Sequence, residues 1–312
     1  MERYVILADI TCDMSSEMRA FCGMEDYVRG HLHISENGEE RDLITTLDWN
    51  EIPCGEFYKT LGNSKAKVST APPNIDEYAD LFTKYVNDGY KVLSMSISAK
   101  VSGTYEFACL GAQRVREAIP GAEIYCFDSM RMSGAFALLT LHAHLLKQEG
   151  KSFSEVIAWL EENKQRVHQM GPIDDLMVVA RRGRLTMGKA IMGSFAGVKP
   201  MGDCNSDGYV TVLTKAKGIR KALDLTVQYI KETAVDPENG YAVITHTDRS
   251  QYAESLKGML EGEIPFRRVF LSESFPGSAT NIGPGMIGVY YFGEKITDLS
   301  AEKAVMARLT GK

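Results

Sequence analysis

The chain has 312 residues, of which 44% are hydrophobic and 24% are charged, and its formal net charge is −6. These proportions are typical of a folded globular protein, and the length is sufficient for two domains. The chain is acidic overall, which argues against nucleic acid as a partner because nucleic acid selects a basic surface.

The sequence carries no signal for secretion or membrane insertion. A strand-like run, Tyr4–Ala8, stands where a signal peptide would need a longer apolar core and a cleavage site. The longest apolar stretch, Ala135–Leu146, is interrupted by two histidines and is too short to span a bilayer. The six cysteines are scattered without a Cys-x-x-Cys pair. We therefore expect a cytoplasmic protein whose thiols stay reduced.

Strands and helices alternate through the first half of the chain. This alternation predicts an α/β domain whose mainly parallel sheet is flanked by helices. Alternating apolar positions around Asn37-Gly38 predict a small hairpin excursion near residues 30–46, because Asn-Gly favours a tight turn. The predicted strands are 4–8, 91–97 and 124–127, and helical periodicity predicts helices over 15–22, 75–88, 105–119, 133–149 and 152–167.

The second half has fewer helices and more closely spaced strands, which predicts an α+β domain with a mixed or antiparallel sheet. Gly171-Pro172 breaks the preceding helical pattern. We therefore assign residues 1–168 to an N-terminal domain and residues 169–312 to a C-terminal domain. The predicted strands of the second domain are 176–180, 198–201, 208–213, 241–245, 268–271 and 285–292.

A cluster of hydroxyl groups lies between a predicted strand and a predicted helix. It comprises Ser98, Ser102 and Thr104, with Gly103 among them. The first amides of a helix have no intrahelical partner and their dipole favours negative charge, so this segment predicts an anion site. Serine and threonine supply neutral donors for it. The structural alternative is that Ser102 or Thr104 only caps the helix.

A second pair of hydroxyls, Ser69 and Thr70, ends another predicted strand just before Pro72 and Pro73. Proline is favoured at the first position of a helix, so we expect a helix to begin here. We expect both hydroxyl loops to lie at the same edge of one parallel sheet and to form a shared anion pocket. Two independent helix caps are the alternative.

Three further segments carry polar groups that suit a binding site. Asp9 and Asp13 follow the first strand, where open α/β sheets place their ligands, or they cap the next helix. The basic run around Arg182 and Arg184 binds an anion or forms a solvated face. The segment before Gly283-Pro284-Gly285 forms the rim of a site or only a structural turn.

Motifs for catalysis and metal binding are missing from the sequence. There is no Gly-x-Ser-x-Gly elbow, no phosphate loop of a nucleotide site and no His/Cys cluster with metal-ligand spacing. We therefore expect a binding protein without catalytic residues, metal or cofactor. The alternative is an enzyme that acts on a small phosphorylated or carboxylated metabolite at the interdomain cleft, using Arg182, Arg184 and Asp9 or Asp13.

In this order and spacing, these segments resemble the DegV family of bacterial fatty-acid-binding proteins, over nearly the whole chain. The family has an Asp-Ser-x-x-Asp loop, a Thr-Ser-x-Pro loop and a Ser-Ser-x-Leu-Ser-Gly-Thr-Tyr motif. The matching segments here are 9–13, 69–72 and 98–105, with further similarity at Asp128-Ser129, at 182–185, at Val198-Lys199-Pro200 and at 283–285.

The resemblance implies the two-domain EDD fold, with one long-chain fatty acid held between the domains. It implies that Thr70 and Ser102 bind the carboxylate, with Ser69, Ser98 and Gly103 nearby. Some members present this carboxylate to a fatty acid kinase, which makes an acyl phosphate. The family often has a histidine tied to kinase function where this chain has Asn281. The acyl tail is expected to run along residues 187–195 and 136–139.

Overall fold

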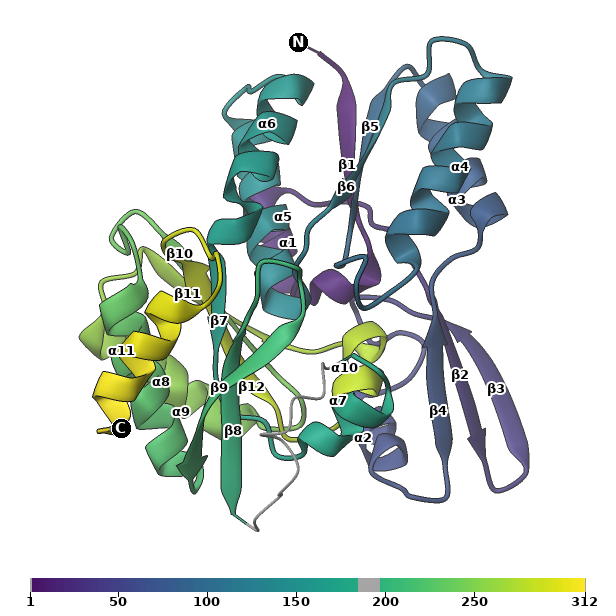
Figure 1. Cartoon of the computed structure of the whole chain (residues 1–312). Helices are drawn as coiled ribbons and strands as arrows, with labels where there is room; N and C mark the ends of the chain where they lie inside the picture. Colours follow the sequence, from purple (N-terminus) through teal and green to yellow (C-terminus); the bar gives the residue numbers. More distant parts are fainter. Residues whose placement is uncertain (1, 185–196, 312) are drawn as a thin grey trace.

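A computed structural model describes residues 2–184 and 197–311 of the chain, which form two halves (Figure 1). The first half contains β1 (Tyr4–Ala8), the 3-10 helix η1 (Ile10–Cys12), α1 (Ser16–Cys22), β2 (His31–Glu36), β3 (Glu39–Ile44), α2 (Cys54–Leu61), β4 (Lys67–Ala71), α3 (Ile75–Asn87), β5 (Lys91–Ser96), α4 (Thr104–Ala118), β6 (Ile124–Asp128), α5 (Ser133–Gln148), α6 (Phe153–Asn163) and the 3-10 helix η2 (Lys164–Arg166). The second half contains β7 (Val167–Met170), α7 (Leu176–Arg181), β8 (Val198–Cys204), β9 (Val210–Lys217), α8 (Ile219–Thr233), β10 (Tyr241–His246), α9 (Ser250–Glu263), β11 (Arg268–Glu273), α10 (Pro276–Ile282), β12 (Ile287–Phe292) and α11 (Ser300–Thr310).

The first half is built on a parallel sheet with the strand order β1-β5-β6. Leu7 and Val92 pack with helices α3 and α4 on one face. Ile6 and Leu93 pack with helix α5 on the other. Successive strand residues point to opposite faces of the sheet, and helices cover both faces. Most residues of these strands are therefore buried, which explains their continuous apolar runs. The predicted parallel sheet between helices is confirmed.

Helix α5 lies between this sheet and the second half of the chain (Figure 1). Eleven of its sixteen residues are buried, because the helix is apolar on almost every side. Its Phe136 belongs to the same core cluster as Ile6 of the first half and Val243 and Phe270 of the second. A single apolar core therefore holds the two halves together.

The second half is built on a mixed sheet with the strand order β11-β10-β12-β7. Strands β10 and β11 are parallel, whereas β12 runs antiparallel to both of its neighbours. Helices α8 and α9 pack against this sheet, and α11 packs on α8. The predicted mixed sheet is confirmed. The boundary placed between residues 168 and 169 falls inside β7, whose Val167 and His168 pair with Phe292 and Tyr291 of β12.

Strand β4 belongs to a separate antiparallel sheet with the order β3-β2-β4. The predicted hairpin, β2 and β3, therefore forms around Asn37 and Gly38 and gains a third strand. The expectation that β4 shares the parallel sheet with β5 is wrong, as is the helix start at Pro72. Helix α3 begins after Asn74, whose side chain accepts a hydrogen bond from the Glu77 amide in a capping box.

Two segments of the second half differ from the prediction. Residues 176–180 lie in helix α7 rather than in a strand, and the Asp175 carboxylate caps this helix by accepting from the Met177 amide at 2.8 Å. A short apolar run is too short to show whether its apolar residues repeat as in a strand or as in a helix, so a buried strand and a buried helix look alike. The polar segment expected as a loop before Gly283 is helical, because Pro276 starts α10. Strand β7 and helix α11 were not predicted.

Helix α5 approaches strand β12 so closely that Gly134 has no room for a side chain. A Cβ atom there would lie 2.2 Å from the ring of Tyr290. We expect Gly134→Ala to destabilise the protein by roughly 1–3 kcal/mol, because the ring and the helix must move apart. Gly258→Ala in α9 is the control, since a Cβ there meets nothing within 4 Å. It should stabilise the fold by about 0.5–1 kcal/mol. Equal melting temperatures for both variants would contradict this account.

Candidate functional site: a cavity between the two halves

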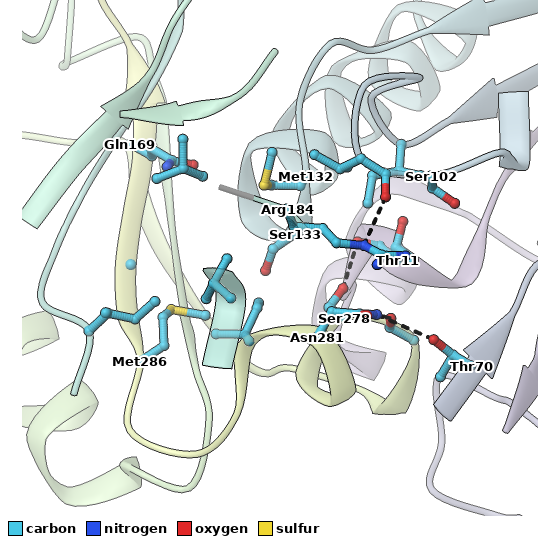
Figure 2. A pocket seen from close by; sticks show the side chains of 18 of the residues that line it. Thr11, Thr70, Ser102, Met132, Ser133, Gln169, Arg184, Ser278, Asn281 and Met286 are labelled. Atoms are coloured by element: carbon cyan, nitrogen blue, oxygen red, sulfur yellow. Dashed lines mark hydrogen bonds between the residues drawn. The ribbon is translucent and has the colours of Figure 1, made fainter. Parts of the chain in front are cut away.

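A cavity of about 240 Å³ lies between the two halves (Figure 2). This volume is many times what a single water needs and is close to the lower end of ligand pockets. The loops after β1 and β5 and strand β4 line it from the first half. Helices α7 and α10, the β8–β9 hairpin and strands β7 and β12 line it from the second half.

The N-terminus of α4 forms one polar end of the cavity. The hydroxyls of Ser102 and Thr104 lie 2.7 Å apart, and the Ser102 hydroxyl also accepts from the Thr104 amide at 3.3 Å. Gly103 precedes the first helical residue, and nothing lies within 4 Å of the position where its Cβ would be. The N-terminus of α4 therefore lies beside open space and two hydroxyls, which is an arrangement suited to an anion.

Thr70 reaches the same cavity from the antiparallel sheet. Asn281 of α10 donates from its side-chain amide to the Thr70 hydroxyl at 3.3 Å and to the Gly277 carbonyl at 3.4 Å. Figure 2 shows this bond, with Thr70 and Ser102 on the same side of the cavity. The structure thus places both hydroxyls at one cavity, although Thr70 lies on a strand of one sheet and Ser102 follows a strand of another. Neither hydroxyl has a histidine or carboxylate as its hydrogen-bond partner in the described part of the chain.

Arg184 supplies a cation to the polar end. Its Nε donates to the Val101 carbonyl at 3.2 Å, and Figure 2 shows the guanidinium group between Ser102 and Ser278. Arg182 does not line this cavity, because its guanidinium donates to the Val68 carbonyl at 2.7 Å and borders a separate polar hollow. The basic run therefore contributes one arginine to the cavity from among its described residues.

The remaining walls are largely apolar. Ser133 at the start of α5 and Met132 just before it line the cavity, rather than the expected 136–139, which are buried in the core between the two halves. The other expected tail-lining segment, 187–195, lies outside the described residues. Sequence analysis missed the apolar groups from α7 and from the strands of the second half, which are Leu176, Val179, Met201, Val210, Val212, Met286 and Ile287.

Ser69 and Ser98 do not line the cavity, although they were expected beside the carboxylate. Ser69 borders the separate polar hollow with Arg182, because neighbouring residues of a strand point to opposite faces. Ser98 is fully buried and donates to the Gly208 carbonyl at 3.1 Å. A Cβ at Gly208 would lie 2.5 Å from the Ser98 hydroxyl, so this contact requires glycine. Ser98 therefore fixes the loop after β5 to the turn between β8 and β9.

Asp9 holds two of the loops that form the cavity. Its carboxylate accepts from the amides of Ile97 and Thr11, each at 2.8 Å, and from the Thr11 hydroxyl. Burial raises the pKa of Asp9, and these hydrogen bonds act in the opposite direction. Because Ile97 begins the loop that leads to Ser102, Asp9 positions the N-terminus of α4.

Asp13 connects the two halves. Its carboxylate accepts from the Phe275 amide at 2.9 Å, just before α10, and from the Ser133 hydroxyl at 2.6 Å, at the start of α5. The carboxylate is fully buried, and burial raises the pKa of Asp13 to about 7. Asp9 and Asp13 were expected as ligands or helix caps. Asp9 caps η1, whereas Ser15 rather than Asp13 caps α1.

Neither a metal-binding cluster nor a membrane-spanning helix is found in residues 2–184 and 197–311. No group of three or more His, Cys, Asp or Glu side chains there has an arrangement that could hold a metal ion. No helix in these ranges is both long enough and apolar enough to cross a bilayer.

The fold and the cavity define a class of protein: an α/β protein of two halves with a cavity between them that is polar at one end. The family model of DegV matches residues 4–294, so the chain belongs to the DegV family. A DegV domain-containing protein from Clostridium perfringens is 27% identical to it over 294 residues, which cover 94% of this chain and 99% of that relative.

Solved structures of the DegV family have the same fold. A Thermus thermophilus member, described as binding fatty acid, matches with a TM-score of 0.80 and 24% identity, covering 94% of this chain and 100% of that one. A Ruminococcus gnavus member, described with vaccenic acid, matches with a TM-score of 0.79 and 22% identity, covering 92% and 99%. At these identities the comparison establishes the fold.

The raised pKa of Asp13 predicts how stability depends on pH. In the unfolded chain the pKa of an aspartate carboxyl is about 4. Between about pH 4 and about pH 7, Asp13 is therefore protonated in the folded state and ionised in the unfolded state. Raising the pH through this window should therefore remove up to about 1.4 kcal/mol of stability per pH unit. Asp13→Asn keeps an acceptor for the Phe275 amide and does not ionise.

We expect the melting temperature of Asp13→Asn to rise relative to the natural protein between about pH 5 and about pH 8. Thermal unfolding of both proteins at the two pH values measures this change. The other titrating groups are common to both proteins and cancel in the difference. A difference in melting temperature that stays constant with pH would show that Asp13 does not titrate in this range.

Proposed function

We propose that this chain binds a long-chain fatty acid in the cavity between its halves. The observation that carries the proposal is a mostly apolar cavity with two neutral hydroxyls and a helix N-terminus gathered at one end. The fatty acid binding described for the Thermus thermophilus member, and the vaccenic acid with the Ruminococcus gnavus member, support it.

The carboxylate is bound at the polar end by the hydroxyls of Thr70 and Ser102 and by the first amides of α4 beside Gly103. A helix N-terminus stabilises an anion through its unpaired amides and its dipole. The Arg184 guanidinium adds a positive charge on the same side of the cavity. Ser69 and Ser98 are not part of the proposed set of ligands, because neither borders the cavity.

The acyl chain extends along the apolar walls of α7 and the second half. Complete burial of about sixteen carbons contributes on the order of 12 kcal/mol, at about 0.8 kcal/mol per methylene, before the costs of binding. Each hydrogen bond to the carboxylate contributes about 1.5–3 kcal/mol. The tail therefore supplies most of the affinity, and the hydroxyls fix the orientation.

The hydrogen bonds of the side chains at the cavity favour a binding protein over an enzyme. Within the described residues, the Ser102 hydroxyl is paired with Thr104 and the Thr70 hydroxyl with Asn281, so neither has a general base. Asp9 and Asp13, the acids of the alternative enzyme, use their carboxylates to hold backbone amides. Arg182 borders a different hollow from Arg184.

We place this protein in the cytoplasm. All six cysteines are free thiols, of which Cys12, Cys22 and Cys204 are buried. Free thiols persist in a reducing compartment, whereas disulfides form in oxidising ones. Detection of the protein in the cytosolic fraction after cell breakage tests this assignment.

Removing the two hydroxyls tests the carboxylate site. Thr70→Val with Ser102→Ala should weaken fatty acid binding by about tenfold to a hundredfold for each hydroxyl removed. Titration of the delipidated proteins with octadecanoic acid measures this loss. The fold should persist because the apolar cores are unchanged.

Ser69→Ala is the matched control, since Ser69 is the neighbour of Thr70 on β4 and faces away from the cavity. It should leave binding unchanged. Full affinity in the double variant would show that the hydroxyls are only structural, and failure of the natural protein to bind any fatty acid would refute the proposed function.

We further propose that Asn281 weakens the coupling to a fatty acid kinase, which is the protein partner that the family resemblance implies. Asn281 stands in the place of the family's histidine and donates to the Thr70 hydroxyl. If this position governs transfer, Asn281→His should increase the acyl phosphate formed when a fatty acid kinase and ATP are added. Equal product from both proteins, at equal fatty acid occupancy, would show that this position does not couple the two proteins.

A further inference from the structure

Gln169 brings a polar group to the otherwise apolar part of the cavity. It pairs directly with Tyr290 across strands β7 and β12, so the two side chains lie on the same face of the sheet. The neighbouring Met170 and Tyr291 belong to the core cluster on the opposite face. Gln169 and Tyr290 both line the cavity.

The Gln169 carboxamide lies far from the proposed carboxylate site. Figure 2 shows it on the opposite side of the cavity from Thr70 and Ser102, with Met132 and Ser133 between. It therefore faces the acyl chain rather than the head group. Binding of the carboxylate at the polar end of the cavity therefore gives the Gln169 carboxamide no role.

The carboxamide also has no hydrogen-bond partner in the described part of the chain. The Gln169 backbone amide donates to the Asp203 carboxylate at 2.9 Å, and that bond leaves the side chain unused. The nearby polar groups are already paired: the Tyr290 hydroxyl accepts from Thr245 at 3.2 Å, and the Ser133 hydroxyl donates to Asp13. The Gln169 side chain thus offers two donors and an acceptor to whatever fills the cavity.

A saturated acyl chain would desolvate this carboxamide without replacing its hydrogen bonds to water. Sites that contain a buried hydrogen-bonding group discriminate against ligands that leave this group unpaired. A hydroxyl on the chain can both donate to the carboxamide and accept from it. We propose that the cavity selects long-chain fatty acids that carry a hydroxyl along the chain, and that Gln169 recognises this hydroxyl. This inference rests on the proposed function.

The test compares the affinities of delipidated protein for octadecanoic acid and for a set of hydroxyoctadecanoic acids. The set carries the hydroxyl near the carboxylate, at mid-chain or near the methyl end. We expect one mid-chain or distal position to bind about tenfold more tightly than octadecanoic acid. Gln169→Leu should abolish this preference and bind octadecanoic acid at least as well as the natural protein does.

Ser69→Ala, which alters a residue outside the cavity, should keep the preference, and Gln169→Met provides a second apolar replacement if the leucine variant does not fold. A natural protein without preference, or a preference retained in the apolar variants, would overturn the inference while octadecanoic acid binding still supports the proposed function. A Gln169-dependent preference for cis-octadecenoic acid instead would also overturn it. No binding of any acid in the set would refute both.

Discussion

The buried carboxylate of Asp13 is the interaction on which the geometry of the cavity depends. It joins three segments that are distant in sequence: the loop after β1, the start of α5 at Ser133 and the start of α10 at Phe275. Helix α10 in turn carries Asn281, which donates to the Thr70 hydroxyl. Two hydrogen bonds, at the two ends of α10, therefore connect the central core to one of the proposed carboxylate ligands. Without the bond to Phe275, α10 would lose one of the contacts that hold it against the first half, beside that of Ser278 with the Thr11 carbonyl.

Much of the fold follows from local patterns, but the pairing of β4 does not. The parallel sheet, the hairpin at Asn37-Gly38 and the mixed second sheet all come from runs whose apolar period is clear. Strand β4 carries the same kind of pattern, yet its partner β2 lies more than thirty residues upstream. Which sheet a strand joins is decided by packing over long distances, which a local pattern does not record. The apolar run that forms α7 is equally ambiguous, because it is too short to show a period.

The candidate site also contains residues that the sequence could indicate and residues that it could not. Thr70, Ser102 and Gly103 stand in motifs that the resemblance made recognisable, and the structure brings all three to one cavity. Residues of one motif do not all reach the site. Ser69 is next to Thr70 in the same motif, but strand alternation directs its side chain to the opposite face of the sheet. The basic run indicated Arg184 as an anion-binding candidate. The contact of Asn281 with Thr70 and the place of Gln169 in the cavity arise only when the second half packs on the first, so no spacing along the chain could indicate them.

The distribution of charge around the cavity fits a ligand that is anionic at one end only. Asp9 borders the cavity and Asp13 lies behind it, and both would repel a carboxylate if their charges were exposed. Burial raises the pKa of each carboxyl, and backbone amides occupy their oxygens. The acids therefore serve as anchors for the loops, whereas neutral hydroxyls, helix amides and Arg184 face the cavity. This separation lets one small region hold the protein together and accept an anion.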